Sequence, residues 1–289
     1  MEEIMKRSIY IFSLMYVTLL SLSQAEELKT PAPSPLGTIT QNVGVIEVSV
    51  SYSRPGVKGR EIFGGLVPYG EIWRTGANKS TTIKFSSDVT IEGNKVSAGE
   101  YALFTIPDEK IWTIILSKNI GDGTSNYKKE DDVARFKITP SNLNRTVERF
   151  TIEIADMTDN SAQFILRWDK IEVSFAMTTD TDSEVMSQIK QVMQNPDLND
   201  ANIYFEAAYY YFNNGKDIKQ ALKWVNTAVE LQPDAFWMSR LASQIQAKLG
   251  DYKTAINTAE FSLKAAEKAG SMQYVNFNKE SIAEWQTKL

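Results

Sequence analysis

The sequence predicts an all-β sandwich followed by an all-α domain of helical repeats. Over residues 38–180, apolar and polar residues alternate in short runs bounded by turn residues, which is typical of half-buried strands. From residue 181 onward, apolar residues recur every three to four positions, and part of the pattern occurs twice at a fixed spacing. We therefore expect an antiparallel sandwich of about nine strands over 38–180 and a helical domain over 181–289.

Residues 1–25 have the layout of a secretory signal peptide. A positively charged start precedes the apolar stretch Ile9–Leu22, and Ser23-Gln24-Ala25 offers a small-x-small cleavage site. The apolar stretch is short for a membrane span of about 20 residues, and an uncleaved anchor is the alternative. Residues 26–37 contain three prolines, which favour an extended linker. We therefore expect cleavage after Ala25, a periplasmic or secreted protein, and no stable membrane span after cleavage.

Alternation of apolar and polar residues places the strands of the predicted sandwich. Gly93-Asn94 separates two apolar runs, and this pair is a signal for a two-residue hairpin turn. Each run has one apolar face, which two sheets packed face to face would bury, while the order of the strands stays open. The expected strands are 48–52, 81–86, 89–91, 101–106, 111–116, 133–138, 147–154, 162–168 and 171–177.

The helical pattern opens with a helix that we expect to be capped by Asp182 and ended by Pro196. A last helix over 275–289 is expected to turn Ile282 and Trp285 inward. Between them, two repeat units resemble tetratricopeptide repeats, whose period is about 34 residues, although the aromatic and Leu-Gly positions usual in the first helix are degenerate. The repeated positions are Ala208, Asp217, Ala221, Leu222 and Val229 in the first unit, matched in the second by Ala242, Asp251, Ala255, Ile256 and Leu263.

Composition excludes several classes of function. The chain has no Cys and no His, so disulfides, thiol nucleophiles, His general bases and Cys/His zinc sites are ruled out. The net charge of −5 and the lack of a long basic run argue against a nucleic-acid partner. The acidic group Glu130–Asp132 lacks the alternate spacing of a calcium loop, so we expect neither metal nor cofactor.

A long, glycine-rich, cationic connection between two predicted strands, residues 53–79, is the candidate binding region. Connections of this length inside a compact domain are usually functional or disordered. Guanidinium groups and glycine N–H groups would suit an anionic or glycan ligand. No catalytic residue is assigned. The candidate ligand-binding residues are Arg54, Lys58, Arg60, Tyr69, Glu71, Trp73, Arg74, Asn78 and Thr81.

Each of these candidates also has a structural interpretation. The arginines would instead pair with Glu61, Glu71 and backbone carbonyl groups and so stiffen a long loop, which is the favoured alternative. Trp73 would belong to the core rather than to a stacking platform with Tyr69. Asn78 and Thr81 would cap their own turn instead of orienting a ligand.

Two elements of the β region form a distinctive pattern. The second is Ala98-Gly99-Glu100-Tyr101. The first consists of Ser53, Arg54, Pro55, Gly59, Arg60, Phe63, Gly64, Val67, Pro68, Tyr69, Gly70, Trp73, Arg74, Gly76, Ala77, Asn78 and Thr81. On these residues, the stretch from 38 to about 180 resembles an uncharacterised family of secreted bacterial domains. The resemblance implies a fold and an envelope location, and it implies no activity.

These observations favour an exported envelope protein that acts as a non-enzymatic binding or adaptor module. The helical repeats would hold a protein or peptide partner, and an aromatic cluster on one helix would serve this role where it is left exposed. A hydrolase acting on glycan or peptide through Glu61, Glu71 or Glu100 is one alternative, and a structural part of an envelope assembly is another. The aromatic cluster consists of Tyr204, Phe205, Tyr209, Tyr210, Tyr211 and Phe212.

Overall fold

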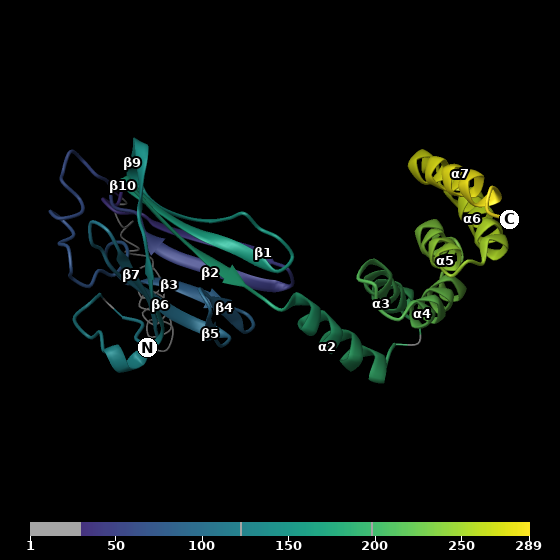
Figure 1. Cartoon of the computed structure of the whole chain (residues 1–289), viewed down its shortest axis with the longest axis horizontal. Helices are drawn as coiled ribbons and strands as arrows, with labels where there is room; N and C mark the ends of the chain where they lie inside the picture. Colours follow the sequence, from purple (N-terminus) through teal and green to yellow (C-terminus); the bar gives the residue numbers. More distant parts are fainter. Residues whose placement is uncertain (1–29, 122, 198) are drawn as a thin grey trace, which may run out of the picture. The chain divides into compact units, whose positions relative to one another are not determined.

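The computed structural model describes residues 30–121, 123–197 and 199–289. The predicted signal peptide and the start of the predicted linker lie outside these residues. The chain divides into two compact units, a β unit that ends at Thr179 and a helical unit that begins at Asp180 (Figure 1). None of the described helices has the length and apolar character that crossing a membrane requires.

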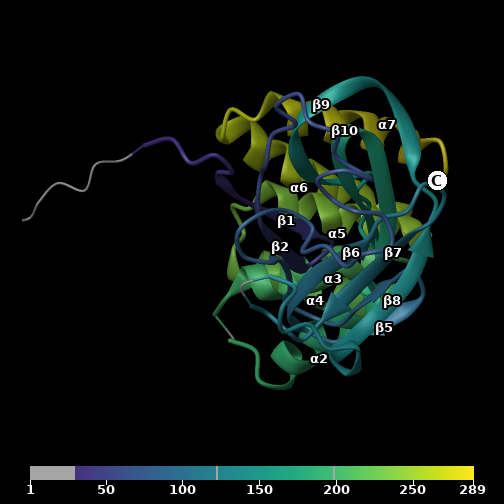
Figure 2. The same ribbon diagram turned by 90° about the vertical axis from the view of Figure 1, so that its left-hand side faces the viewer.

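The β unit is a sandwich of two antiparallel sheets, as the sequence predicts (Figures 1 and 2). One sheet has the strand order β1-β2-β3-β6-β7-β8, and the other has the order β5-β4-β10-β9. The strands are β1 (Leu36–Val43), β2 (Ile46–Ser53), β3 (Thr81–Phe85), β4 (Val89–Ile91), β5 (Asn94–Val96), β6 (Gly99–Ile106), β7 (Trp112–Ser117), β8 (Asp132–Ile138), β9 (Ser141–Ala155) and β10 (Ser161–Thr178).

The core of the sandwich is formed by the apolar side of each alternating strand. In β2, Val48 and Val50 are fully buried, while the intervening Ser49 is not. The two sheets meet around a cluster of aromatic rings, in which the rings of Trp73 and Trp168 stack with their centroids 5.7 Å apart. Aromatic pairs of this kind bury large areas and favour stacked or edge-to-face geometries. The other rings of the cluster belong to Phe63, Trp112 and Phe150.

The longest strands differ from the expected ones. The stretches 162–168 and 171–177 are one strand, β10, and its pairing with β9 shifts register between Arg167 and Ile171. Asp169 lies in that shift with φ of 52°, a conformation that a bulge tolerates and that interrupts the apolar alternation. At the other end of the unit, β1 begins at Leu36, inside the stretch expected to be linker.

The helical unit consists of six helices within the described residues. The predicted cap of the first helix is wrong by two residues, because the side chain of Asp180, not Asp182, accepts the N–H of Ser183 at 3.1 Å. The repeated Asp217 and Asp251 cap equivalent helices, which explains why they recur at the same position of each repeat. The helices are α2 (Thr181–Gln194), α3 (Ala201–Asn213), α4 (Ile218–Leu231), α5 (Phe236–Lys248), α6 (Tyr252–Lys268) and α7 (Met272–Gln286).

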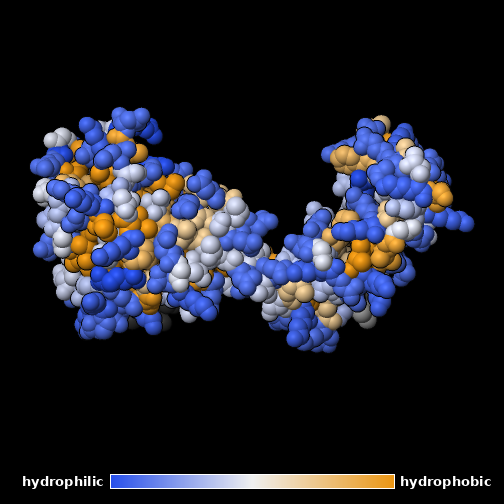
Figure 3. All heavy atoms as spheres, viewed as in Figure 1, coloured by the Kyte–Doolittle hydropathy of each residue, from blue (hydrophilic) through white to orange (hydrophobic). Residues whose placement is uncertain are grey.

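Small residues let the repeated helices pack closely. Ala208, Ala221, Ala242 and Ala255 are all almost completely buried where α3 meets α4 and α5 meets α6. In the last helix, Trp285 is buried and Ile282 packs against the same cluster, as predicted. On the face shown in Figure 3, hydrophilic residues cover most of both units, and apolar residues gather in separate patches.

Candidate functional site

Residues 53–79 form an ordered connection that is bonded to both sheets of the sandwich. Backbone hydrogen bonds of Pro55 and Val57 join it to β9 at 2.9 and 2.8 Å. Trp73 exchanges two backbone hydrogen bonds with Thr105 of β6, at 2.7 and 2.9 Å. The connection therefore ties the four-stranded sheet to the six-stranded sheet, and we call it the closing segment.

Two arginines of the closing segment donate hydrogen bonds within the β unit. The guanidinium of Arg54 donates to the carbonyl oxygen of Phe150 at 3.2 Å and to the hydroxyl of Thr151 at 3.0 Å, both on β9. Arg60 donates to two carbonyl oxygens of its own segment, three and four residues earlier, at 3.1 and 2.6 Å. Within the described residues, neither arginine forms an ion pair with Glu61 or Glu71. These donors therefore satisfy backbone and hydroxyl oxygens rather than carboxylates.

Trp73 lies in the core, which is the interpretation the sequence favours. Its side chain is 9% exposed, and its indole N–H donates to the carbonyl oxygen of Gly76 at 3.0 Å. A stacking platform for a ligand would need an accessible ring face, and this buried ring instead contacts the rings of Phe63, Phe150 and Trp168.

Asn78 and Thr81 hold the end of the closing segment. The amide of Asn78 donates to the hydroxyl of Ser53 at 3.2 Å, and Asn78 adopts a positive φ of 59°. The buried hydroxyl of Thr81 donates to the carbonyl oxygen of Thr75 at 2.6 Å. Thr81 therefore bonds back to its own turn, whereas Asn78 joins the end of the closing segment to its start.

The four remaining candidates differ in their exposure to solvent. Lys58 and Glu71 are exposed, and Arg74 is half-buried beside Gly123. Tyr69 is 39% exposed, and its ring packs against Gly64.

The surroundings of Tyr69 are acidic. Burial raises the pKa of its hydroxyl, and the negative charges of Glu109, Glu61 and Asp108 raise this pKa further. An acidic neighbourhood of this kind does not favour an anionic ligand at Tyr69.

A cavity of about 410 Å³ lies beside the closing segment, but none of the nine candidate residues lines it. Lys79 is the one charged residue among its described lining, so no pair of carboxylates for glycoside hydrolysis faces this cavity. Glu61, Glu71 and Glu100 are all exposed elsewhere on the surface. The lining consists of Leu36, Ser51, Tyr52, Ser53, Lys79, Ser80, Thr82, Ile120 and Gly121.

The helical unit has a groove formed by α3, α5 and α7, the helices that begin successive repeats. It encloses about 280 Å³, and most of the side chains along it are aromatic. We call it the aromatic groove. The lining consists of Phe205, Tyr209, Phe212, Asn213, Trp237, Arg240, Leu241, Gln244, Tyr274 and Phe277.

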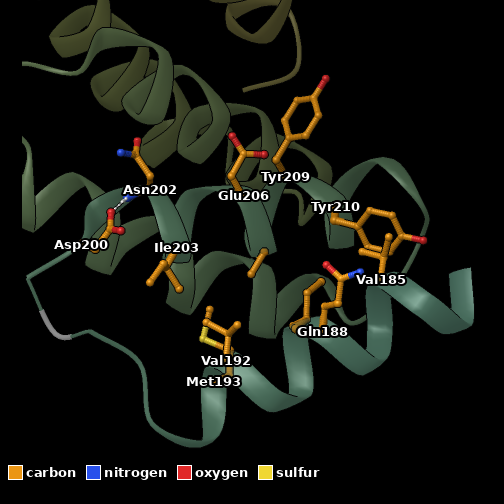
Figure 4. A pocket seen from close by; sticks show the side chains of 12 residues that line it. Val185, Gln188, Val192, Met193, Asp200, Asn202, Ile203, Glu206, Tyr209 and Tyr210 are labelled. Carbon is orange, nitrogen blue, oxygen red and sulfur yellow. Dashed lines mark hydrogen bonds between the residues drawn. The ribbon is translucent and has the colours of Figure 1, made fainter. Parts of the chain in front are cut away.

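A second, apolar cavity of about 560 Å³ lies between α2 and α3 (Figure 4). Figure 4 shows Val185 and Val192 of α2 pointing toward α3 across this cavity. One side chain ties the two elements together, because the carboxylate of Asp182 accepts from Lys216 at 2.7 Å and from Tyr210 at 2.8 Å.

This carboxylate should titrate at an acidic pH below the ordinary range. The hydrogen bond from Lys216, and then the one from Tyr210, lowers the pKa of Asp182 from its ordinary value of 3.8. A folded-state pKa below the unfolded value means that the contribution to stability is complete above pH 3.8 and is lost as the pH falls through the folded pKa. We expect an NMR titration of the Asp182 carboxyl carbon to give a pKa below 3.8, and Lys216→Met to raise it toward that value. Lys219→Met serves as the control, and an unchanged pKa in Lys216→Met would refute the assignment.

Sequence reasoning found part of the aromatic groove. It identified the aromatic residues of α3 but not Arg240, Trp237, Tyr274 or Phe277. Extending the repeat by one more unit provides a signal, because Tyr274 follows Arg240 at the spacing of one repeat and lies on the next first helix. The composition of the closing segment predicts a binding region, whereas in the structure its Arg54 and Trp73 hold the two sheets together.

Comparison with known proteins identifies the β unit alone. Among curated proteins, none matches the chain significantly. No metal-binding cluster of three or more acidic side chains occurs in the described part of the chain. A match between residues 34–177 and a family model confirms the resemblance to a domain of unknown function. The β unit is similar to the protein family of unknown function DUF2911.

Proposed function

We propose that the protein is an exported, non-enzymatic binding module whose helical unit holds an extended segment of a partner protein. The aromatic groove is the observation that carries this proposal. Tyr209 is 50% exposed and Phe277 is 38% exposed, so both present aromatic surface that the described residues leave uncovered. Aromatic side chains supply large contact areas at low cost in conformational entropy, and they dominate the binding energy of many interfaces.

The shape of the groove supports an extended ligand. Its lining comes from three successive first helices of a helical array, and such arrays present extended concave binding surfaces. Asn213 and Gln244 add amide groups at its wall, which suits the backbone of a peptide. A periplasmic or secreted location rests on the basic start, apolar stretch and cleavage site of residues 1–25.

Selection from displayed random peptides tests the proposal. We expect the purified full-length chain to enrich peptides, and Tyr209→Ala or Phe277→Ala to raise their Kd by about tenfold, which corresponds to about 1.4 kcal/mol. Phe261→Ala is the matched control, because Phe261 is 46% exposed on α6 and does not line the groove. Its effect on Kd should be negligible.

Two results would overturn this function. One is the absence of any peptide enriched above background. The other is an equal loss of binding in the groove variants and in Phe261→Ala, which would place the binding surface elsewhere.

A further inference from the structure

One side of α5 carries a line of polar groups along the aromatic groove. Arg240, Gln244 and Lys248 are spaced by four residues, so they lie above one another on the same face of the helix. Arg240 and Gln244 line the groove directly. The ammonium of Lys248 lies 5.0 Å from the ring centre of Phe212, which also lines the groove.

Arg240 is held in place without a carboxylate partner among the described residues. Its guanidinium lies 5.0 Å from the ring centre of Phe277, and its Nη1 donates to the side-chain oxygen of Asn278 at 3.3 Å. Asn278 is fully buried and is itself fixed by a 2.9 Å bond to the hydroxyl of Ser262. Most N–H donors of the guanidinium therefore remain for a ligand.

The partial burial of the Arg240 guanidinium also favours an anionic ligand. Partial burial lowers the pKa of its guanidinium, and electrostatic interactions with Tyr274 and Glu280 oppose this effect without reversing it. Glu280 does not approach within ion-pair distance in the described structure. Removing a cation from water without an ion-pair partner is costly, and an anionic ligand group would offset that cost.

The distance between the two cations defines a spacing in the ligand. Eight residues at about 1.5 Å per residue separate the Cα atoms of Arg240 and Lys248 by about 12 Å along α5. An extended peptide rises about 3.3 Å per residue, so about four residues span this distance. The lining of the groove contains no Asp or Glu that would repel an acidic ligand.

We propose that the ligand of the aromatic groove is an extended peptide with two carboxylates about four residues apart, one bound by Arg240 and the other by Lys248. This inference rests on the proposed function and names the chemistry of its ligand. A guanidinium and a carboxylate form a charge-assisted pair with defined geometry, which an amide would not reproduce. Acidic side chains supply both groups, or the free C-terminus of the partner supplies one of them.

Two libraries of random twelve-residue peptides, one with a free C-terminus and one with a blocked C-terminus, test the inference on the full-length chain. We expect Asp or Glu to be enriched in pairs four positions apart. Enrichment in both libraries identifies side-chain carboxylates, whereas a single acidic residue four positions before a free C-terminus identifies the terminal group. The consensus peptide should bind Arg240→Gln and Lys248→Gln about tenfold more weakly than the unchanged chain.

Controls separate charge in the groove from net charge. Lys264→Gln removes one exposed cation from α6, outside the groove, and should leave Kd unchanged. Arg240→Lys should retain part of the affinity, because it keeps the charge and loses the forked geometry. Raising the salt concentration should weaken the unchanged chain more than Arg240→Gln.

The outcomes distinguish the two proposals. Enriched peptides that lack paired acidic residues, with binding lost in Phe277→Ala but kept in Arg240→Gln, would overturn this inference and leave the proposed function standing. The absence of any enriched peptide would overturn the proposed function and this inference together.

Discussion

Replacing Trp73 by Ala should lower the free energy of unfolding of the β unit by about 3–5 kcal/mol. The ring of Trp73 stacks on that of Trp168 and contacts Phe150, so its removal leaves a cavity where the two sheets meet. The same change removes the indole hydrogen bond to Gly76 and leaves a buried carbonyl oxygen without this partner. Urea denaturation followed by circular dichroism measures the loss.

Tyr69→Ala is the control for the Trp73 variant. It removes an aromatic ring from the same closing segment, but Tyr69 is 39% exposed, so the expected loss is below about 1 kcal/mol. Equal losses in the two variants would contradict the assignment of Trp73 to the core. A stable Trp73→Ala variant would return Trp73 to the list of ligand-binding candidates.

Gly76→Ala should cost about 3 kcal/mol, because it combines backbone strain with a steric clash. Gly76 has φ of 153°, and an added Cβ would lie 3.0 Å from the carbonyl oxygen of Ser53 and 3.1 Å from the hydroxyl oxygen of Thr81. Neither atom is free to move away, since Ser53 and Thr81 are both buried and the hydroxyl of Thr81 bonds to Thr75. Thermal or urea unfolding measures the change.

Gly70→Ala separates the two contributions to that cost. Gly70 also has a positive φ, 76°, but an added Cβ would meet no atom within 4 Å. This variant should therefore lose only the backbone term, about 1 kcal/mol. If Gly76→Ala cost no more than Gly70→Ala, close packing around Gly76 would be refuted as the reason for a glycine there.

The alternation of apolar and polar residues predicts the β-sandwich, and their helical period predicts the helical repeats. Val48 and Val50 reveal a buried strand face by their spacing alone, and the two capping residues Asp217 and Asp251 reveal the repeat. The same reasoning divided β10 in two at Asp169, because a bulge changes which side of the sheet a residue faces and so looks like a turn.

Sequence composition is a weaker guide to the use of charged residues. Arg54 of the closing segment satisfies oxygens from β9, and those partners lie far along the chain from it. No local pattern shows whether a cation will meet such a partner or solvent. Arg240 presents the opposite case, since nothing near it in sequence indicates that α7 supplies an aromatic ring and an amide but no carboxylate at ion-pair distance.

The closing segment also has a consequence for how the β unit folds. The hydroxyl of Tyr52, next to this segment, bonds to both the N–H and the carbonyl oxygen of Ile152, at 3.0 and 3.1 Å, across 100 residues of sequence. Contacts so distant in sequence slow folding, because a long loop must be closed before they form. Arg54 and Trp73 can therefore contact their partners only after β9 and β10 have left the ribosome or the export channel. The first half of the β unit thus reaches its final packing only when nearly all of that unit is available.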